Sequence, residues 1–317
     1  MSELDEHEGV IDLVVRSMTL VADGVMGVEL IDPDGYLLPE WEPGAHIDVG
    51  LDDLVRQYSL CGSTADRTRY LVAVLQEPKS RGGSSFIHEI LRPGDLVEVG
   101  GPRNHFSLAP AKEYLFVAGG IGITPILPMI EQAERDRIPW RLHYGGRTRI
   151  SMAFTDRLKQ YGDRVALQPE DEAGRLDIAS ILGDPKDGVA VYCCGPTGLI
   201  NAVEAGCSHW PDGALNVERF AGKDLSGLES KPFTIRCDRS DLNLEVGASE
   251  TILDVLEGAG IGVANACRDG VCGSCEVAVL GGRPEHRDSF RAAGDDDCTS
   301  IAVCVSRSRT SEIVLDL

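Results

Sequence analysis

A chain of 317 residues, 43% of them hydrophobic, is long enough to form two or three packed domains. Its formal net charge of -21 repels nucleic acid and anionic membranes, which excludes both as expected partners. The start MSELDEHEGV lacks the basic residues and the apolar stretch of a signal peptide, and no membrane-spanning run of apolar residues follows. The sequence therefore predicts a cytoplasmic protein.

Residues 8–107 contain short apolar segments separated by turn residues. Strands are expected at 10–20, 46–51, 69–76 and 95–102, each bounded by Gly, Pro or charged residues. One helix is expected at 84–91, where Ser84 and Ser85 can cap its free amide groups. Many short strands at roughly even spacing predict an antiparallel β-barrel.

The pattern then changes to apolar strands that alternate with helices. One helix is expected at 124–136, with Thr124 as its N-cap and Pro125 in the first helical position, and another at 151–160. This alternation predicts a parallel α/β sheet, with ligands at the carboxyl ends of its strands. The expected strands are 114–120, 140–146, 164–168, 189–195 and 215–220.

A polar segment at 221–232 separates these two blocks from a third one. In the third block, 233–237 and 242–246 are expected to form a hairpin, 250–260 an amphipathic helix and 311–317 a closing strand. The predicted domain boundaries are 1–107 for the barrel, 108–222 for the α/β domain, 223–231 for the linker and 232–317 for the C-terminal domain.

The third block contains cysteines with the spacing of an iron–sulfur site. The pattern C-x4-C-x2-C, followed after 28 residues by another cysteine, is the plant-type pattern for a 2Fe-2S cluster. Gly270 and Gly273 allow the loop to fold around a cluster and to direct backbone N–H groups toward its sulfurs. Zinc is the alternative metal for these cysteines, but structural zinc sites favour paired C-x2-C ligands. The predicted ligands are Cys267, Cys272, Cys275 and Cys304.

The fourth ligand position has two candidates. Cys298 follows the acidic run GDDD, which is typical of a solvated loop, whereas Cys304 lies in the apolar strand candidate SIAVCVSR. A strand presents a fixed and protected sulfur, so Cys304 is the predicted ligand. The six cysteines that are not predicted ligands, Cys298 among them, are scattered apart from the adjacent pair Cys193 and Cys194, and isolated cysteines usually act as small apolar residues.

Two stretches of the barrel carry residues suited to a ring system and a phosphate. In RQYSLC, Arg56 and Tyr58 share one face of a strand, and Ser59 offers a hydroxyl and an N–H group. In KSRGGSSFIHEI, Arg81, two glycines and two serines lie at the start of a helix, an arrangement that favours phosphate binding.

Two turns of the α/β block are suited to a dinucleotide. VAGGIGITP, residues 117–125, joins a strand to a helix through glycines that permit close approach of a ligand to the backbone. YCCGPTG, residues 192–198, ends another strand with a thiol, a glycine and a proline. Elsewhere, Arg147 and Arg149 follow a parallel strand, where they either hold the extra phosphate of NADPH or remain surface charges.

Taken in this order, the motifs resemble those of the phthalate dioxygenase reductase family, which includes the reductases of vanillate O-demethylases. The resemblance covers essentially the whole chain and extends to HRD at 286–288 and CVSR at 304–307. It implies an FMN-binding antiparallel barrel, a NAD-binding parallel α/β domain and a C-terminal plant-type ferredoxin domain with the β-grasp fold.

The resemblance also implies roles for individual residues. Ser59, Cys194 and Phe220 are expected beside the reacting atoms of the flavin and the nicotinamide, and the four cysteines are expected to hold the cluster. NADH is favoured over NADPH. The FMN-binding residues are expected to be Arg56, Gln57, Tyr58, Ser59, Arg81, Gly82, Gly83 and Ser84, with Phe220 nearby. The NADH-binding residues are expected to be Gly119, Gly120, Gly122, Thr124, Pro125, Arg147, Cys194, Gly195 and Pro196.

These inferences predict a NADH-dependent reductase that passes single electrons to the Rieske-type oxygenase component of an aromatic-ring or O-demethylating system. A flavin is required because NADH delivers two electrons as a hydride, whereas a 2Fe-2S centre accepts one electron at a time. Arg268, Asp269 and Ser274, at the edge of the cluster loop, are the expected docking face. The alternatives are a reductase for a heme monooxygenase, a redox sensor and a flavin-less ferredoxin carrier with a zinc-like cysteine site.

Overall fold

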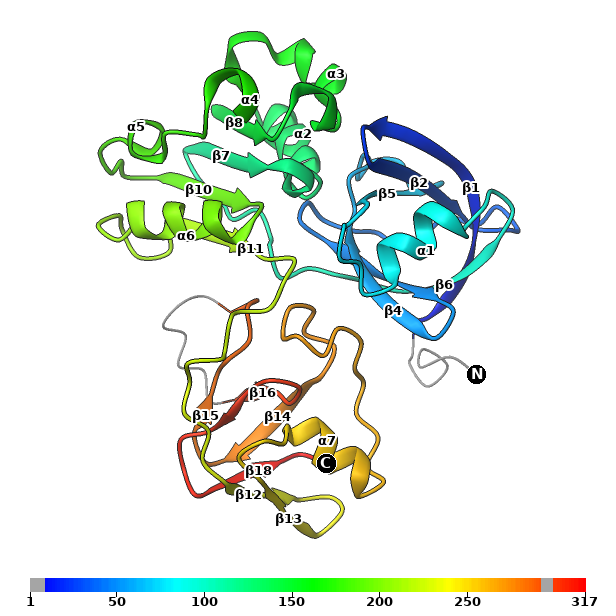
Figure 1. Cartoon of the computed structure of the whole chain (residues 1–317), viewed down its shortest axis with the longest axis vertical. Helices are drawn as coiled ribbons and strands as arrows, with labels where there is room; N and C mark the ends of the chain where they lie inside the picture. The colour runs from blue at the N-terminus through cyan, green and yellow to red at the C-terminus, as the bar shows by residue number, and fades with distance from the viewer. Residues whose placement is uncertain (1–8, 292–298) are drawn as a thin grey trace. The chain divides into compact units, whose positions relative to one another are not determined.

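The computed structural model describes residues 9–291 and 299–317, so the rejected ligand candidate Cys298 lies outside the described residues. The chain divides into two compact units, Met1–Arg219 and Phe220–Leu317. The first unit holds a barrel and a parallel sheet, and the second holds a mixed five-stranded sheet and a two-stranded sheet (Figure 1). All helices in the described part of the chain are too short or too polar to span a bilayer.

The barrel is a six-stranded antiparallel sheet in the order β4-β3-β6-β1-β2-β5. The two ends of this order meet where Leu60, next to β4, pairs with Val72 of β5. Aliphatic side chains such as Leu13, Val28 and Ile47 fill its core, and the predicted barrel is confirmed. Its strands are β1 (Ile11–Ala22), β2 (Val25–Ile31), β3 (His46–Leu51), β4 (Leu54–Ser59), β5 (Tyr70–Leu75) and β6 (Leu96–Arg103).

The helix of this domain, α1 (Gly83–Glu89), begins differently from the prediction. Its N-cap is Gly82, which has a φ of 97° and no side chain to cap the helix. The expected capping by Ser84 and Ser85 is therefore wrong. Instead, the Ser80 hydroxyl accepts hydrogen bonds from the amides of Gly82 (3.1 Å) and Ser85 (3.3 Å).

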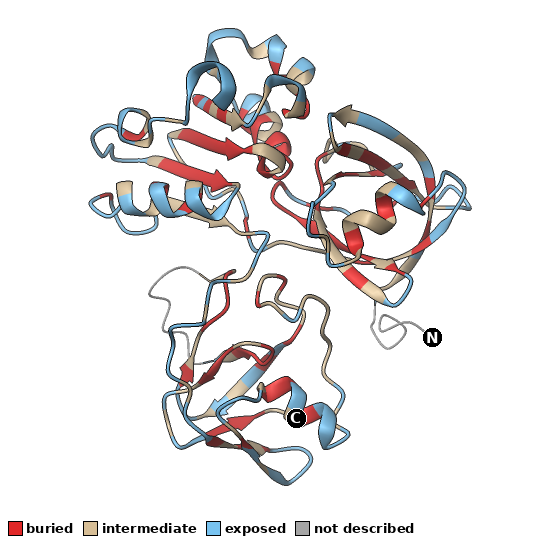
Figure 2. Cartoon of the chain, in the orientation of Figure 1, coloured by how far each residue is buried: buried red, intermediate tan, exposed pale blue. Residues whose placement is uncertain are grey.

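The second sheet has five parallel strands in the order β11-β10-β7-β8-β9, as predicted. Its central strands are buried on both faces (Figure 2). Phe116 and Trp140 pack with α2 on one face, and Val117 and Val191 pack with α6 on the other. The strands are β7 (Glu113–Gly119), β8 (Trp140–Gly146), β9 (Val165–Pro169), β10 (Val189–Cys194) and β11 (Leu215–Glu218).

The helices of this sheet are shorter than the sequence pattern predicts. Pro125 is the N-cap of α2, and Thr124 lies in the preceding 3-10 turn, where its hydroxyl donates to the Ile121 carbonyl (2.9 Å). The predicted Thr124 cap is therefore wrong, and the expected helix at 151–160 is broken into short turns. The helical segments are η1 (Gly120–Ile123), α2 (Ile126–Asp136), η2 (Arg149–Ser151), α3 (Thr155–Leu158), η3 (Lys159–Arg164), α4 (Glu170–Ala173), α5 (Ile178–Leu182) and α6 (Thr197–Gly206).

The second unit has a mixed sheet in the order β13-β12-β18-β14-β16. The predicted hairpin, helix and closing strand are all present, and Leu253 and Leu256 of α7 pack into the core of this unit. Cys304 lies in a turn after β16 and not in a strand, so that part of the prediction is wrong. The elements are β12 (Phe233–Cys237), β13 (Leu242–Val246), α7 (Ile252–Gly258), β14 (Glu276–Gly281), β15 (Pro284–Glu285), β16 (Ser300–Ala302), β17 (Arg307–Ser308) and β18 (Glu312–Leu315).

Candidate functional site

The four predicted cluster ligands come together in the second unit. The Cys267 thiol lies within hydrogen-bonding reach of Cys272 and Cys304, and Cys275 lies within reach of Cys304. Three of the four are buried, Cys267 is partly exposed, and none forms a disulfide. The turn that follows β16 therefore presents Cys304 to the loop that carries the other three cysteines.

The loop backbone supplies donors to these sulfurs. Gly270 (φ 69°) and Gly273 (φ 72°) adopt the left-handed conformation that glycine favours, which lets the chain curl back on itself. The amides of Asp269 (3.4 Å) and Val271 (3.5 Å) consequently point at the Cys267 sulfur. Hydrogen bonds from the Cys272 and Cys304 thiols, then from these amides, lower the pKa of Cys267, which favours the thiolate that binds metal.

This donor set fits a two-iron cluster. Four thiolates and several backbone N–H groups are the ligands and outer contacts of a 2Fe-2S centre. Within residues 9–291 and 299–317, no three His, Cys, Asp or Glu side chains are arranged to hold one metal ion. A two-iron cluster divides its four thiolates between two atoms, so they need not converge on a single point as zinc ligands do.

The two predicted phosphate-binding stretches of the barrel meet. The Arg56 guanidinium donates to the Arg81 carbonyl (2.7 Å), which brings β4 against the loop before α1. A Cβ at Gly83 would lie 2.6 Å from Arg56 Cγ, and a Cβ at Gly82 would lie 2.5 Å from Leu54 Cδ1. Only glycines allow this approach, so the loop and the cationic side chain form one cradle.

The neighbouring residues of β4 point in different directions. The Gln57 amide donates to the buried carboxylate of Asp48 (2.7 Å), which also pairs with Arg103. Burial raises the pKa of the Tyr58 hydroxyl, consistent with a ring that lies largely out of water. Gln57 thus supports the barrel in this structure, and its role toward a cofactor stays a prediction.

At the end of β4, Ser59 forms part of a polar cluster with Glu218 and Cys194. The Ser59 hydroxyl donates to Glu218 Oε2 (3.4 Å), and the Cys194 thiol lies 3.9 Å from the same oxygen. Burial raises the pKa of Glu218 to about 8, and burial also raises the pKa of Cys194, followed by the charge of Glu218. Glu218 itself is partly buried, and the raised pKa favours the protonated form of a carboxyl group that lies between two residues predicted to be beside the reacting atoms.

Glu218 was missed in the sequence. It pairs with Cys194 in the register of β10 and β11, at the carboxyl ends of adjacent parallel strands. A carboxylate at the end of a strand next to YCCGPTG, two residues before Phe220, is the signal that could have identified it. Phe220 itself has a side chain that is 43% exposed.

The two glycine-rich turns of the α/β sheet also meet. A Cβ at Gly122 would lie 2.3 Å from the Cys194 carbonyl oxygen, and one at Gly119 would lie 2.7 Å from Pro196 Cδ. A Cβ at Gly195 would likewise lie 2.9 Å from the Cα of Gly119. The ends of β7 and β10 therefore form a single surface of bare backbone, and Thr124 and Pro125 follow directly.

The two arginines after β8 are not equivalent. Arg149 makes a double hydrogen bond with Glu172, at 3.0 and 2.6 Å. Arg147 is exposed, and its guanidinium has no hydrogen-bond or ion-pair partner in the described part of the chain. Arg147 is therefore free for a ligand, whereas Arg149 is already occupied.

Comparison with known proteins adds to this geometry. Residues 235–309 match a family described as a 2Fe-2S iron-sulfur cluster binding domain. Phenoxybenzoate dioxygenase subunit beta of Ectopseudomonas oleovorans is 41% identical, over 97% of this chain and 97% of that protein. Phthalate dioxygenase reductase of Burkholderia cepacia is 37% identical, over 98% of this chain and 99% of that protein.

Solved structures agree with these relatives. A phthalate dioxygenase reductase, described as a modular structure for electron transfer from pyridine nucleotides to 2Fe-2S, has a TM-score of 0.73, 36% identity and full coverage of both chains. An intact type IV self-sufficient cytochrome P450 monooxygenase has a TM-score of 0.92 and 41% identity over 97% of this chain. This chain spans only 41% of that longer protein.

Proposed function

Because the chain belongs to the phthalate dioxygenase reductase family, we propose that it transfers electrons from NADH through FMN and a 2Fe-2S cluster to an oxygenase component. The observation that carries this proposal is the gathering of four thiols, with two backbone amides directed at the sulfur of Cys267. A bound nicotinamide would supply a hydride, a bound flavin would convert it into single electrons, and a 2Fe-2S cluster held by the four cysteines would carry those electrons one at a time.

The residues of the first unit then have distinct tasks. Arg56 and the loop at 81–84 bind the FMN phosphate, and Tyr58 packs against the flavin ring. The bare backbone of Gly119, Gly122 and Gly195 admits the nicotinamide nucleotide. Ser59 donates its hydroxyl proton to Glu218 Oε2, which leaves the Ser59 oxygen able to accept a hydrogen bond from the ring, and the raised pKa of Glu218 lets its carboxyl group hold a proton close by.

The pairing of Arg149 supports NADH over NADPH. Arg149 is paired with Glu172, which leaves Arg147 as the available cation of the pair after β8. One exposed arginine binds a ribose phosphate more weakly than the pair that the sequence offers.

We infer that the acceptor is a Rieske-type oxygenase of an aromatic or O-demethylating system, because relatives that match the whole chain are named as dioxygenase reductases. Arg268, Asp269 and Ser274 are proposed as the docking face, and Arg268 is exposed there beside Glu257 of α7. A heme monooxygenase is the second candidate, since the intact P450 protein shares this architecture. A cytoplasmic location is part of the same proposal.

An anaerobic titration with NADH tests the electron path. The flavin absorbance should bleach, and a rhombic reduced-cluster signal should appear in low-temperature electron spin resonance. Bleaching without any cluster signal would contradict the path to the cluster. Many turnovers with artificial acceptors would exclude a redox sensor, and iron and flavin assays would exclude a flavin-less zinc carrier.

A further inference from the structure

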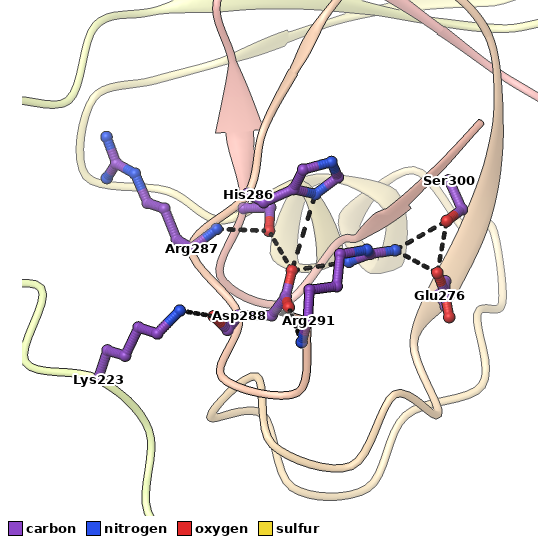
Figure 3. Close-up of polar contacts among 8 residues, drawn as sticks. Lys223, Glu276, His286, Arg287, Asp288, Arg291 and Ser300 are labelled. Carbon is purple, nitrogen blue, oxygen red and sulfur yellow. Dashed lines mark hydrogen bonds and ion pairs between the residues drawn. The ribbon is translucent and has the colours of Figure 1, made fainter. Parts of the chain in front are cut away.

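A buried polar segment lies beside the cluster loop but contributes no ligand. Arg287, Asp288 and Ser289 are 6%, 1% and 4% exposed, which is unusual for residues of these types. Figure 3 shows Asp288 at the centre of this network, with Arg291 and His286 turned toward it. Buried charges need partners, so the network has a specific arrangement to maintain.

The Asp288 carboxylate is fixed by its neighbours. Arg291 donates a hydrogen bond from its guanidinium Nη1 to Oδ2 (2.7 Å) and another from its backbone amide to Oδ1 (3.2 Å). The Ser306 hydroxyl lies 3.5 Å from Oδ2. Arg291 is held in turn by Ser300 (2.7 Å) and by Glu276 (Figure 3). These hydrogen bonds restrain the main chain of Asp288 and Ser289, whose own polar groups bond to two other segments.

One side of that main chain holds the cluster loop. The Ser289 amide donates to the Gly270 carbonyl (2.7 Å), between the first and second cysteine ligands. A Cβ at Gly270 would lie 3.1 Å from Asp288 Cα, so the two backbones are in contact.

The other side holds the segment that leads in from β11. Lys223 Nζ donates to the Asp288 carbonyl (2.6 Å) (Figure 3). The Lys223 amide donates to the Ser289 hydroxyl (3.1 Å). One residue earlier, a Cβ at Gly222 would lie 2.5 Å from the Asp269 carbonyl oxygen of the cluster loop. Further along, Arg287 donates to the Glu229 carbonyl and to Ser230, both at 2.9 Å.

We propose that Lys223 is a positioning residue that clamps the connecting segment 219–231 to the cluster loop and thereby speeds electron entry into the cluster. The inference rests on the proposed function. With the clamp in place, the chain from Glu218 to Lys223 spans at most about 18 Å when extended. If both Lys223 contacts are lost, the next hydrogen-bonded anchor is the Glu229 carbonyl, and the span grows to about 39 Å.

The length of this tether sets an expected magnitude. The effective concentration of one unit at the other falls roughly as the -3/2 power of the length of the segment that joins them. Release of the clamp should therefore lower this concentration about threefold. Electron transfer also weakens steeply with distance. We therefore expect the double variant Lys223→Met/Ser289→Ala, which removes both contacts, to slow reduction of the cluster about threefold or more after rapid mixing with NADH. Lys223→Met alone should slow it less, and Lys223→Arg should keep the wild-type rate, because a guanidinium also donates to a carbonyl.

The matched control is Lys231→Met. Lys231 lies on the same segment, but its side chain is 77% exposed and its ammonium group lies 3.8 Å from Glu229, a long contact. The loss of charge is the same in both variants, so a difference between them isolates the clamp. Ser289→Ala is the second variant, since it removes the acceptor of the Lys223 amide and keeps the amide that holds Gly270.

Two readouts do not depend on NADH turnover. The spin signal of the dithionite-reduced cluster should be the same in all variants, while amide hydrogen exchange at 219–228 should be faster in Lys223→Met and in Ser289→Ala. Exchange and rates equal to those of the Lys231→Met control would overturn the inference. A wild-type cluster that dithionite reduces and NADH does not would instead refute the proposed function, and the exchange result would still decide on the clamp.

Discussion

Glu218 provides a prediction whose size follows from the structure. Burial raises the pKa of its carboxyl group from 4.5 to about 8, so between these pH values it is protonated in the folded chain and ionised in the unfolded one. The unfolded state then binds fewer protons, and the stability of the fold decreases as pH rises from 4.5 to 8. At 1.36 kcal/mol per pKa unit this amounts to about 5 kcal/mol, as an upper bound.

The variant Glu218→Gln removes this dependence because its amide does not ionise. The difference in unfolding free energy between variant and wild type should grow in favour of the variant up to pH 8 and remain constant above it. Glu89→Gln is the control, because Glu89 is an exposed residue of the same unit. The wild type should also lose rapid flavin reduction by NADH as pH rises through about 8, whereas the variant should show no inflection there.

Urea unfolding followed by tryptophan fluorescence is a suitable assay. The three tryptophans, Trp41, Trp140 and Trp210, all lie in the first unit, so their signal reports on the unit that contains Glu218. Cofactor content must be matched between the proteins. A stability difference that stays constant from pH 4.5 to 8 would show that Glu218 is hydrated, and would refute the proton-holding role assigned to it.

Three further predictions concern the cluster, the nucleotide turn and the docking face. Cys304→Ser should abolish the reduced-cluster spin signal and lower iron content, whereas Cys237→Ser, a buried cysteine of the same unit, should keep both. Gly122→Ala should weaken NADH binding at least tenfold, measured by titration, because its Cβ would collide with the Cys194 carbonyl at 2.3 Å. Arg268→Glu should slow electron transfer to the oxygenase component several-fold at low salt, and the effect should disappear at high salt; an unchanged rate at every salt concentration would exclude this docking face.

The sequence predicted those features that depend on local patterns. The spacing of Cys267, Cys272 and Cys275 is a property of one loop, and the strands of both sheets follow from short runs of apolar residues. Helix starts were less predictable, because a hydroxyl caps a helix only if the backbone places it there. Ser80 bonds the first turn of α1 from outside the helix, and Pro125 displaces Thr124 at the start of α2.

The place of Glu218 at a strand end could be predicted from the sequence, but its contacts could not. Ser59 lies on a barrel strand 159 positions earlier, and Cys194 lies on the adjacent strand of the parallel sheet to which Glu218 belongs. Its raised pKa comes from burial, which depends on how the barrel and the α/β sheet pack and not on any neighbouring residue. The Lys223 clamp was missed for a related reason, since the polar segment 221–232 has the composition of a free linker.

The stretch from Glu218 to Lys223 joins three proposed tasks within one short piece of chain. Glu218 holds a proton at the end of β11, Phe220 follows it with an exposed ring, and Lys223 fastens the chain to the segment that supports the cluster loop. Lengthening this stretch by insertion after Ala221 should slow electron entry into the cluster without changing the pH dependence set by Glu218. Because the three tasks depend on different contacts, a substitution at one of these residues should leave the other two tasks intact. A single substitution that impairs all three would show instead that the stretch acts as one element.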